Sequence, residues 1–221
     1  MSNPDPQARR PGWPLLAGVA LVVVTVLAVV LVVGLKSRQP PGPPLPVYGT
    51  IPDFTLTNQH GAAVSLADLR GRVWVADIIF TRCAGPCPNM TRQMRQLQDA
   101  LPPASQAQLV TLTTDPDFDT PAVLNTYAAR FGADPKRWMF LTGSKDQIGK
   151  LAIDSLKLTA IEKNPGERES PADLFIHSTI FVIVDKRGQL RGVFETVGEG
   201  IDPRAVLTQI LAAVKRLERE P

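Results

Sequence analysis

Two cysteines, Cys83 and Cys87, are the only ones in the 221-residue chain, and they lie four positions apart in the stretch FTRCAGPCPNM. A separation of one helical turn, about 6 Å, is within the range that a disulfide can bridge. A disulfide that closes so short a ring removes little entropy from the unfolded chain, so stability alone is a weak reason for the pair. Three kinds of chemistry remain open: a redox-active dithiol, a peroxidatic cysteine with a resolving partner, or two thiolate ligands of one metal ion.

The residues around the pair indicate that it lies where a strand leads into a helix. The run RVWVADIIF at 72–80 is nearly all apolar and rich in β-branched residues, which is typical of a buried central strand. Pro86 and Pro88 suit the first turn of a helix, where the missing N–H of proline would have no partner. The amides and the dipole at a helix N terminus stabilise a thiolate, so we expect a lowered cysteine pKa. Arg82 and Arg92 are expected to be solvated.

His177, in the stretch DLFIHSTIFVIVD, is the candidate for a further ligand. It directly precedes a strongly apolar predicted strand, a position that in the thioredoxin fold lies in the loop facing the active-site cysteines. Two thiolates and one imidazole suit Cu(I), or Cu(II) with a fourth weak ligand, whereas structural zinc takes four ligands. Asp173, four positions before His177, is a candidate fourth ligand but is expected on the loop surface, and His60 is expected in a solvated hairpin turn. The residues therefore favour copper held by Cys83, Cys87 and His177, with reversible disulfide formation between the cysteines as the alternative.

The rest of the chain predicts an α/β fold in which strands and helices alternate. Thr120 is a suitable N-cap, Pro121 a suitable first residue and Gly132 a suitable end for one of the helices. Met90 and Met94 have helical spacing, and we expect them in the core rather than at a copper site. The expected strands are 72–80, 108–115, 137–143, 178–185 and 188–195, and the expected helices are 88–101, 120–132, 144–153 and 202–220.

This order of elements, with a cysteine pair between the first central strand and its helix, is that of the thioredoxin-like fold. We therefore expect a central β-sheet flanked by helices on both faces. The polar segment 162–176 interrupts the pattern and is interpreted as a mobile loop that leads to His177.

An uncharged, strongly apolar run of 21 residues, Leu15 to Leu35, predicts a single transmembrane helix. At 1.5 Å per residue it spans about 30 Å, the thickness of a bilayer core, and a convincing cleavage site for a signal peptide is missing. We expect a tail at 1–14, a membrane anchor at 15–35, a proline-rich linker at 36–50 and a thioredoxin-like domain at 51–221. The short tail favours a cytoplasmic N terminus and an exported C-terminal domain.

The charge of the chain is unevenly placed. The formal net charge is +3, and the surplus of basic residues lies in the first 50 positions, so residues 51–221 are neutral overall. A nucleic-acid-binding domain would carry a basic stripe on its folded part. We therefore expect no nucleic-acid partner.

Three motifs in order, FTRCAGPCP, TTDPDFDTPAVLNTYAARFG and DLFIHSTIFVIVD, resemble the SCO/SenC family over about residues 50–215. The resemblance implies a membrane-tethered, thioredoxin-like copper protein that takes part in the assembly of cytochrome c oxidase. It implies Cys83, Cys87 and His177 as the copper ligands and places Asp115 near the site. The family motif has a proline directly after the first cysteine, where this chain has Ala84.

The resemblance implies one of two roles that use the same residues. The protein would deliver Cu(I) or Cu(II) to the binuclear copper site of cytochrome c oxidase subunit II or to another copper-transfer partner, or it would keep the cysteines of that subunit reduced. We expect a metallochaperone, with a thiol–disulfide oxidoreductase that needs no metal as the alternative. The expected location is the inner, cytoplasmic membrane, with the C-terminal domain in the periplasm.

Overall fold

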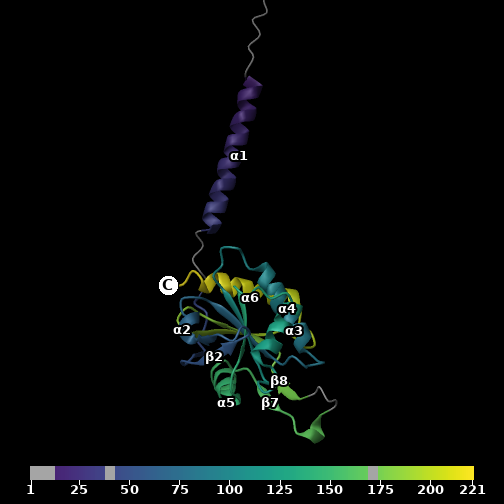
Figure 1. Ribbon diagram of the computed structural model, residues 1–221. Helices are drawn as coiled ribbons and strands as arrows, with labels where there is room; N and C mark the ends of the chain where they lie inside the picture. Colours follow the sequence, from purple (N-terminus) through teal and green to yellow (C-terminus); the bar gives the residue numbers. More distant parts are fainter. Residues whose placement is uncertain (1–12, 38–42, 169–173) are drawn as a thin grey trace, which may run out of the picture. The chain divides into compact units, whose positions relative to one another are not determined.

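A computed structural model of the chain describes residues 13–37, 43–168 and 174–221 (Figure 1). The chain divides into two compact units, residues 1–44 and 45–221. The first unit contains helix α1 (Trp13–Ser37). Over the described residues, no helix combines the length and the apolar character that a membrane span requires, so the transmembrane helix predicted at 15–35 is not confirmed.

The second unit is built on a mixed eight-stranded sheet. Its three central strands, β4, β5 and β6, run parallel, and the other neighbouring strands pair antiparallel. In spatial order the strands are β1 (Gly49–Thr50), β10 (Gln189–Glu195), β9 (Ile180–Val184), β4 (Trp74–Ile79), β5 (Gln108–Thr113), β6 (Trp138–Thr142), β2 (Thr55–Asn58) and β3 (Ala63–Ser65). All five predicted strands are confirmed to within two residues at each end.

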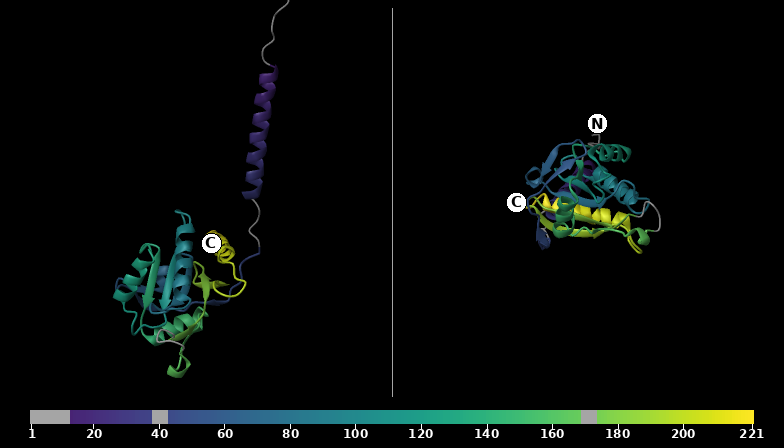
Figure 2. Two further views of the ribbon diagram at one scale, coloured as in Figure 1. Left: turned by 90° about the vertical axis from the view of Figure 1, so that its right-hand side faces the viewer. Right: turned by 60° about the horizontal axis from the view of Figure 1, so that its bottom comes forward.

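Helices cover both faces of the sheet, as predicted (Figure 2). Side chains of β4 alternate between the faces: Val75 and Ile79 belong to one buried cluster, and Ala76 and Ile78 to the other. The first cluster is completed by α3 (Cys87–Ala100), α4 (Pro121–Arg130) and α6 (Pro203–Leu217), and the second by α2 (Leu66–Leu69), α5 (Lys145–Gly149) and the π-helix η1 (Lys150–Ser155). Both clusters lie wholly within residues 45–221, so this domain carries its own hydrophobic core.

Local sequence signals explain where the helices begin and end. The Thr120 hydroxyl accepts a hydrogen bond from the Val123 N–H at 3.4 Å, and Pro121 is the first residue of α4. Gly132 follows the helix with a φ of +69°, a left-handed conformation that glycine adopts without strain. Met90 and Met94 of α3 are fully buried in the first cluster, which confirms their assignment to the core.

Two elements differ from the prediction. The helix expected at 144–153 is split, because its second half winds as the π-helix η1. The loop expected at 162–176 overlaps both strands of an antiparallel hairpin, β7 (Ala160–Glu162) with β8 (Phe175–His177), and contains a short 3-10 helix, η2 (Pro165–Glu167). The strands have three residues each, too few for an apolar pattern to reveal them. Residues 169–173, including Asp173, lie outside the described residues.

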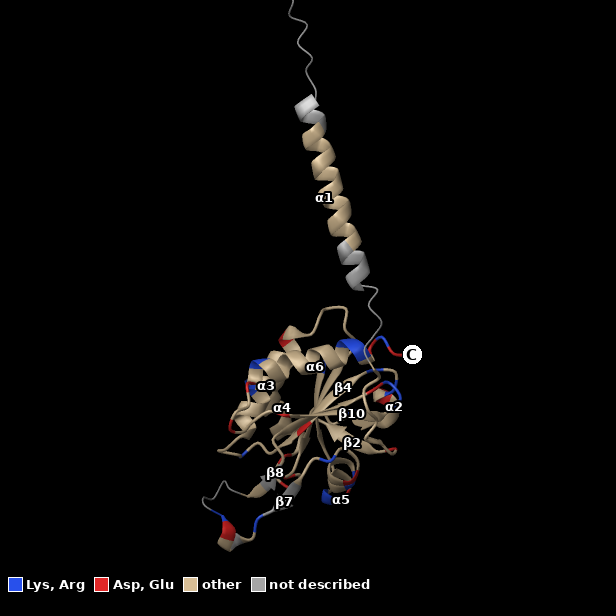
Figure 3. Cartoon of the chain, turned by 180° about the vertical axis from the view of Figure 1, so that it is seen from behind, with Lys and Arg blue, Asp and Glu red and all other residues tan. Residues whose placement is uncertain are grey.

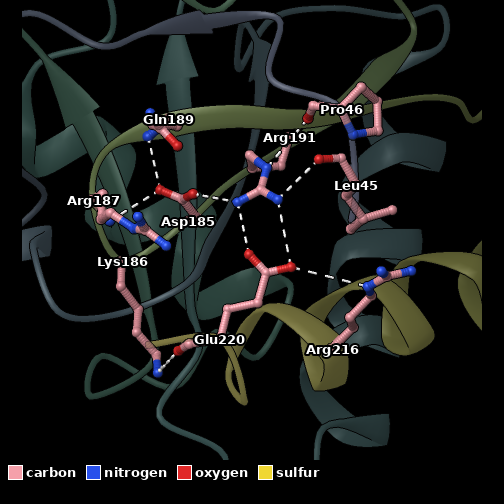
Figure 4. A network of polar contacts seen from close by, with 9 residues as sticks. All are labelled: Leu45, Pro46, Asp185, Lys186, Arg187, Gln189, Arg191, Arg216 and Glu220. Carbon is pink, nitrogen blue, oxygen red and sulfur yellow. Dashed lines mark hydrogen bonds and ion pairs between the residues drawn. The ribbon is translucent and has the colours of Figure 1, made fainter. Parts of the chain in front are cut away.

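Arg191 of β10 forms a buried ion-pair network at one end of the sheet (Figure 4). Its guanidinium donates to Asp185 at 2.6 Å and to Glu220, just beyond α6, at 2.8 Å. It also donates to the main-chain carbonyls of Leu45, at 2.9 Å, and Pro46, at 3.2 Å. The network joins the beginning of the domain, the β9–β10 hairpin and the C-terminal residues.

Candidate functional site

The two cysteines lie at the opposite end of β4 from Arg191, where the strand leads into α3. Cys83 follows the end of β4 and is partly exposed, whereas Cys87 is the first residue of α3 and is buried. Both are present as thiols. The main-chain N–H of Cys83 donates to the Phe80 carbonyl at 3.2 Å, and the N–H of Gly85 faces the Cys83 sulfur at 3.3 Å. The predicted strand–helix junction is therefore confirmed.

Burial dominates the acidity of Cys87. Its side chain is fully buried in the first core cluster, and this burial raises the pKa of the Cys87 thiol, as does the neighbouring Cys83 thiol to a smaller degree. A hydrogen bond from the Phe80 main chain acts in the opposite direction and is too weak to reverse the shift. The predicted lowering of the cysteine pKa is thus wrong for Cys87, because loss of solvent outweighs the helix N terminus.

The hairpin that carries His177 lies at the same edge of the sheet. His177 is the last residue of β8, paired with Ala160, and β9 begins three residues later at Ile180. Because β9 runs antiparallel to β4, its beginning lies beside the end of β4, from which the cysteine loop departs. The ring of Phe175 confirms the proximity, since it packs edge-on against the ring of Phe80 with centroids 5.1 Å apart.

A complete set of metal ligands is not seen among the described residues, where no three His, Cys, Asp or Glu side chains gather as a metal site. The side chain of His177 is outside the described part of the structure, so the ligand set of Cys83, Cys87 and His177 stays a prediction. His60 is exposed in the turn between β2 and β3, as expected.

Asp115 lies near the cysteine loop through its pairing with Arg82. An oxygen of the largely buried Asp115 carboxylate is 2.5 Å from a guanidinium nitrogen of Arg82, and the guanidinium also stacks over the ring of Phe118 at 4.0 Å. Arg82 and Arg92 are both exposed, as expected, but Arg82 also forms this ion pair, which the sequence did not predict. The structure thus connects the residue that precedes Cys83 to the end of β5.

Asp119 is a site residue that the sequence analysis missed. Its fully buried carboxylate accepts hydrogen bonds from the main-chain N–H of Thr81 at 3.1 Å, from the Thr81 hydroxyl, and from the Thr113 hydroxyl at 2.5 Å. Burial raises the pKa of Asp119, and these hydrogen bonds oppose the shift in part. The carboxylate therefore holds the cysteine loop to the end of β5. The signal was an aspartate directly before the N-cap Thr120 in a stretch with three aspartates.

Buried polar side chains also form hydrogen bonds near the first turn of α3 and in the adjacent strand β4. The Thr91 hydroxyl donates to the main-chain carbonyl of Cys87 at 2.9 Å and lies 2.9 Å from the Tyr127 hydroxyl. Asp77, the one charged residue of β4, accepts a hydrogen bond from the Thr111 hydroxyl at 2.6 Å. Of these contacts, the one between Thr91 and Tyr127 links the first turns of α3 to α4.

The fold and the site define a class of protein: a thioredoxin-like α/β domain with a dithiol at the strand–helix junction and a histidine-bearing hairpin at the same sheet edge. The model of the SCO1/SenC family matches residues 46–215, more than three quarters of the chain. The chain belongs to the SCO1/SenC family.

Individual relatives agree with this assignment. The SCO1 protein homolog of Bacillus subtilis is 38% identical over 148 residues, which cover 66% of this chain and 73% of the relative. A protein of Stutzerimonas stutzeri named for copper binding is 32% identical over 169 residues, 76% of this chain and 79% of the relative. The solved structure of BsSco, described as a member of the Sco family of cytochrome c oxidase assembly proteins with a disulfide switch, is 31% identical. It has a TM-score of 0.67 and is matched over all of its length and 81% of this chain.

Proposed function

We propose that this protein binds copper through Cys83, Cys87 and His177 and delivers it to the binuclear copper site of cytochrome c oxidase subunit II. The observation that carries the proposal is the meeting of the dithiol loop and the hairpin of His177 at one sheet edge, with Phe80 against Phe175. The family, the copper-binding relative and the oxidase-assembly description of BsSco support it.

The residue types of the proposed ligands support a soft, monovalent copper ion. Two thiols, one just before α3 and one at its first residue, offer two sulfur ligands, and the proposed third ligand is His177, whose backbone belongs to the neighbouring hairpin. Copper requires deprotonated thiols, so binding displaces protons and is favoured by a higher pH. The raised pKa of Cys87 strengthens this dependence, because burial makes its proton harder to remove.

A thiol–disulfide exchange function on the cysteines of a copper-receiving protein is the second candidate. The unequal environments of the two cysteines favour it, because Cys83 is accessible to an incoming disulfide and Cys87 is buried behind it as a resolving thiol. In this reaction the Cys83 sulfur attacks the disulfide of the partner, and Cys87 then attacks the mixed disulfide. The partner leaves with two thiols, and Cys83 and Cys87 are left oxidised to a disulfide.

We further propose that the domain works at a membrane surface on the exported side, held there by the N-terminal part of the chain. The uncharged run from Leu15 to Leu35 supports a membrane location, as do the exposed apolar side chains between Val19 and Leu31. Membrane fractionation of the full chain and of residues 45–221 tests this: the full chain should sediment with membranes, and the shorter piece should stay soluble.

The binding proposal is tested by titrating the reduced domain, residues 45–221, with Cu(I) against a competing chelator. We expect one equivalent bound by the wild type, loss of tight binding in Cys83→Ser and Cys87→Ser, and weaker binding in His177→Ala. His60→Ala is the matched control, because His60 is exposed and distant in sequence from the site. Wild-type affinity in His177→Ala would refute the three-ligand site. X-ray absorption should report two sulfur neighbours and one nitrogen neighbour.

The same variants separate the two functions. If thiol exchange is the main role, His177→Ala should reduce a model disulfide at nearly the wild-type rate, and either cysteine variant should be inactive. If copper delivery is the main role, His177→Ala should lose copper transfer to subunit II, and prior oxidation of the wild type to the disulfide should abolish binding.

A further inference from the structure

Phe80 links the cysteine loop to the hairpin of His177. Its ring is 2% exposed and packs edge-on against Phe175 at a centroid distance of 5.1 Å and an interplanar angle of 63°. Its main chain meets both cysteines: the carbonyl accepts the Cys83 N–H at 3.2 Å, and a hydrogen bond from the Phe80 main chain reaches the Cys87 thiol. One residue thus contacts the dithiol through its backbone and the hairpin through its side chain.

Phe175 is an apolar anchor for that hairpin. Strands β7 and β8 form a separate two-stranded sheet that, over the described residues, pairs with no strand of the main sheet. A two-stranded hairpin of this length is marginally stable alone, so its position depends on side-chain packing. Its distal part carries charged residues, including Lys163, Glu167 and Arg168 (Figure 3), whereas Leu174 and Phe175 pack against the first core cluster.

We propose that Phe175 is a positioning residue whose contact with Phe80 sets how often the hairpin is docked with His177 presented to the two cysteines. This inference depends on the proposed copper site. If only the docked hairpin supplies the third ligand, the apparent affinity for copper falls in proportion to the docked fraction. The ring contact then decides how readily copper is released to a partner.

The size of the effect follows from the contact. An edge-to-face aromatic pair contributes a bias of roughly 2- to 10-fold between the docked and undocked hairpin beyond its buried area. Loss of the ring contact in Phe175→Ala should therefore weaken Cu(I) binding by up to about this factor. Phe175→Leu keeps an apolar side chain without a ring and should have a smaller effect.

The decisive experiment is a double-mutant cycle on the reduced domain, residues 45–221, measured by Cu(I) competition. Phe175→Ala, His177→Ala and the double variant are compared with the wild type. If Phe175 acts through His177, Phe175→Ala has no further effect on affinity in the His177→Ala background. Phe54→Ala is the matched control, because Phe54 is a partly buried phenylalanine that packs against the other core cluster, and its substitution should leave copper affinity unchanged.

A second measurement follows the hairpin itself. Hydrogen exchange of the copper-free domain should accelerate in Phe175→Ala at the amides of β7 and β8 and stay unchanged in β4 and β5. An equal loss of affinity from Phe175→Ala with and without His177, or unchanged exchange in the hairpin, would overturn the inference. Failure of the proposed function looks different: the wild type would then bind no copper that depends on its cysteines, and the inference would fall with it.

Discussion

Replacing Arg191 with methionine should strongly destabilise the domain, because it breaks a buried ion pair. The Arg191 and Asp185 side chains are each only 5% exposed, and their closest atoms are 2.6 Å apart. Methionine fills much of the volume of the arginine stem but donates no hydrogen bond. The substitution therefore leaves the carboxylate of Asp185 buried without its cation and removes the donors from the carbonyls of Leu45 and Pro46.

The magnitude follows from the exposure of the two acids. Breaking a buried ion pair from one side costs about 3–5 kcal/mol. Asp185 is buried and keeps only the main-chain donors of Arg187 and Gln189, whereas Glu220 is 24% exposed and can turn to water. We therefore expect a loss of about 3 to 4 kcal/mol in the free energy of unfolding, close to the lower end of that range because only one acid is stranded.

Urea denaturation of residues 45–221 measures this loss directly. Arg204→Met, on the exposed face of α6, is the matched control and should change the free energy of unfolding by no more than about 0.5 kcal/mol. Hydrogen exchange should locate the effect, because the Tyr48 N–H, bonded to the Leu190 carbonyl at 2.8 Å, should exchange faster. A loss below about 1 kcal/mol would show that the network is no more than a surface ion pair and would refute the reasoning.

Three further predictions concern the cysteine loop. Asp119→Asn removes an acceptor for buried hydroxyl donors and should lower the free energy of unfolding by about 1–3 kcal/mol. Because burial raises the pKa of Asp119, the stabilisation by its protonated form is complete below about pH 4 and is lost as the pH rises. Urea denaturation at several pH values should therefore find the cost of the substitution greatest in acid, and a cost that grows toward neutral pH would contradict this. Alkylation of the native reduced domain should label Cys83 and spare Cys87, even at a pH where an ordinary thiol, with a pKa of about 8.5, is ionised. The reason is that Cys87 is buried and its pKa is raised. Equal labelling of the two cysteines, measured by peptide mass spectrometry, would refute the described burial. Arg82→Met strands the largely buried carboxylate of Asp115 and should lower the free energy of unfolding by about 1 kcal/mol, a modest value because Arg82 is itself half exposed; an unchanged denaturation midpoint would mean that the pair contributes nothing.

The sequence alone was enough to predict most of the fold. Apolar periodicity identified the central strand at 72–80 and the buried face of α3, because each strand or helix must turn one set of side chains toward the core. The boundaries of α4 could also be predicted from the sequence, because Thr120, Pro121 and Gly132 define the helix ends through their own backbone or their nearest neighbours. The position of the cysteine pair at a strand–helix junction followed from the same local signals.

Other parts of the site depend on residues that meet only after folding. Asp119 and Thr81 are hydrogen-bonded although they are 38 positions apart in the sequence, and Phe80 and Phe175 pack together although they are 95 positions apart. Neither contact can be predicted from a local sequence pattern. The β7–β8 hairpin is too short to be read from periodicity, and it gains its place from packing against the core.

The sequence by itself determined which residues can do chemistry and which elements carry them, because residue type and local propensity are properties of short stretches of chain. Only the tertiary structure decided the environment of that chemistry. It buried Cys87 and so raised a pKa that the helix N terminus alone would lower. It also brought the hairpin of His177 to the edge from which the cysteine loop departs, because β9 returns antiparallel beside β4. Solvent exclusion and contacts between distant segments are properties of the packed domain, and they set how the two cysteines behave.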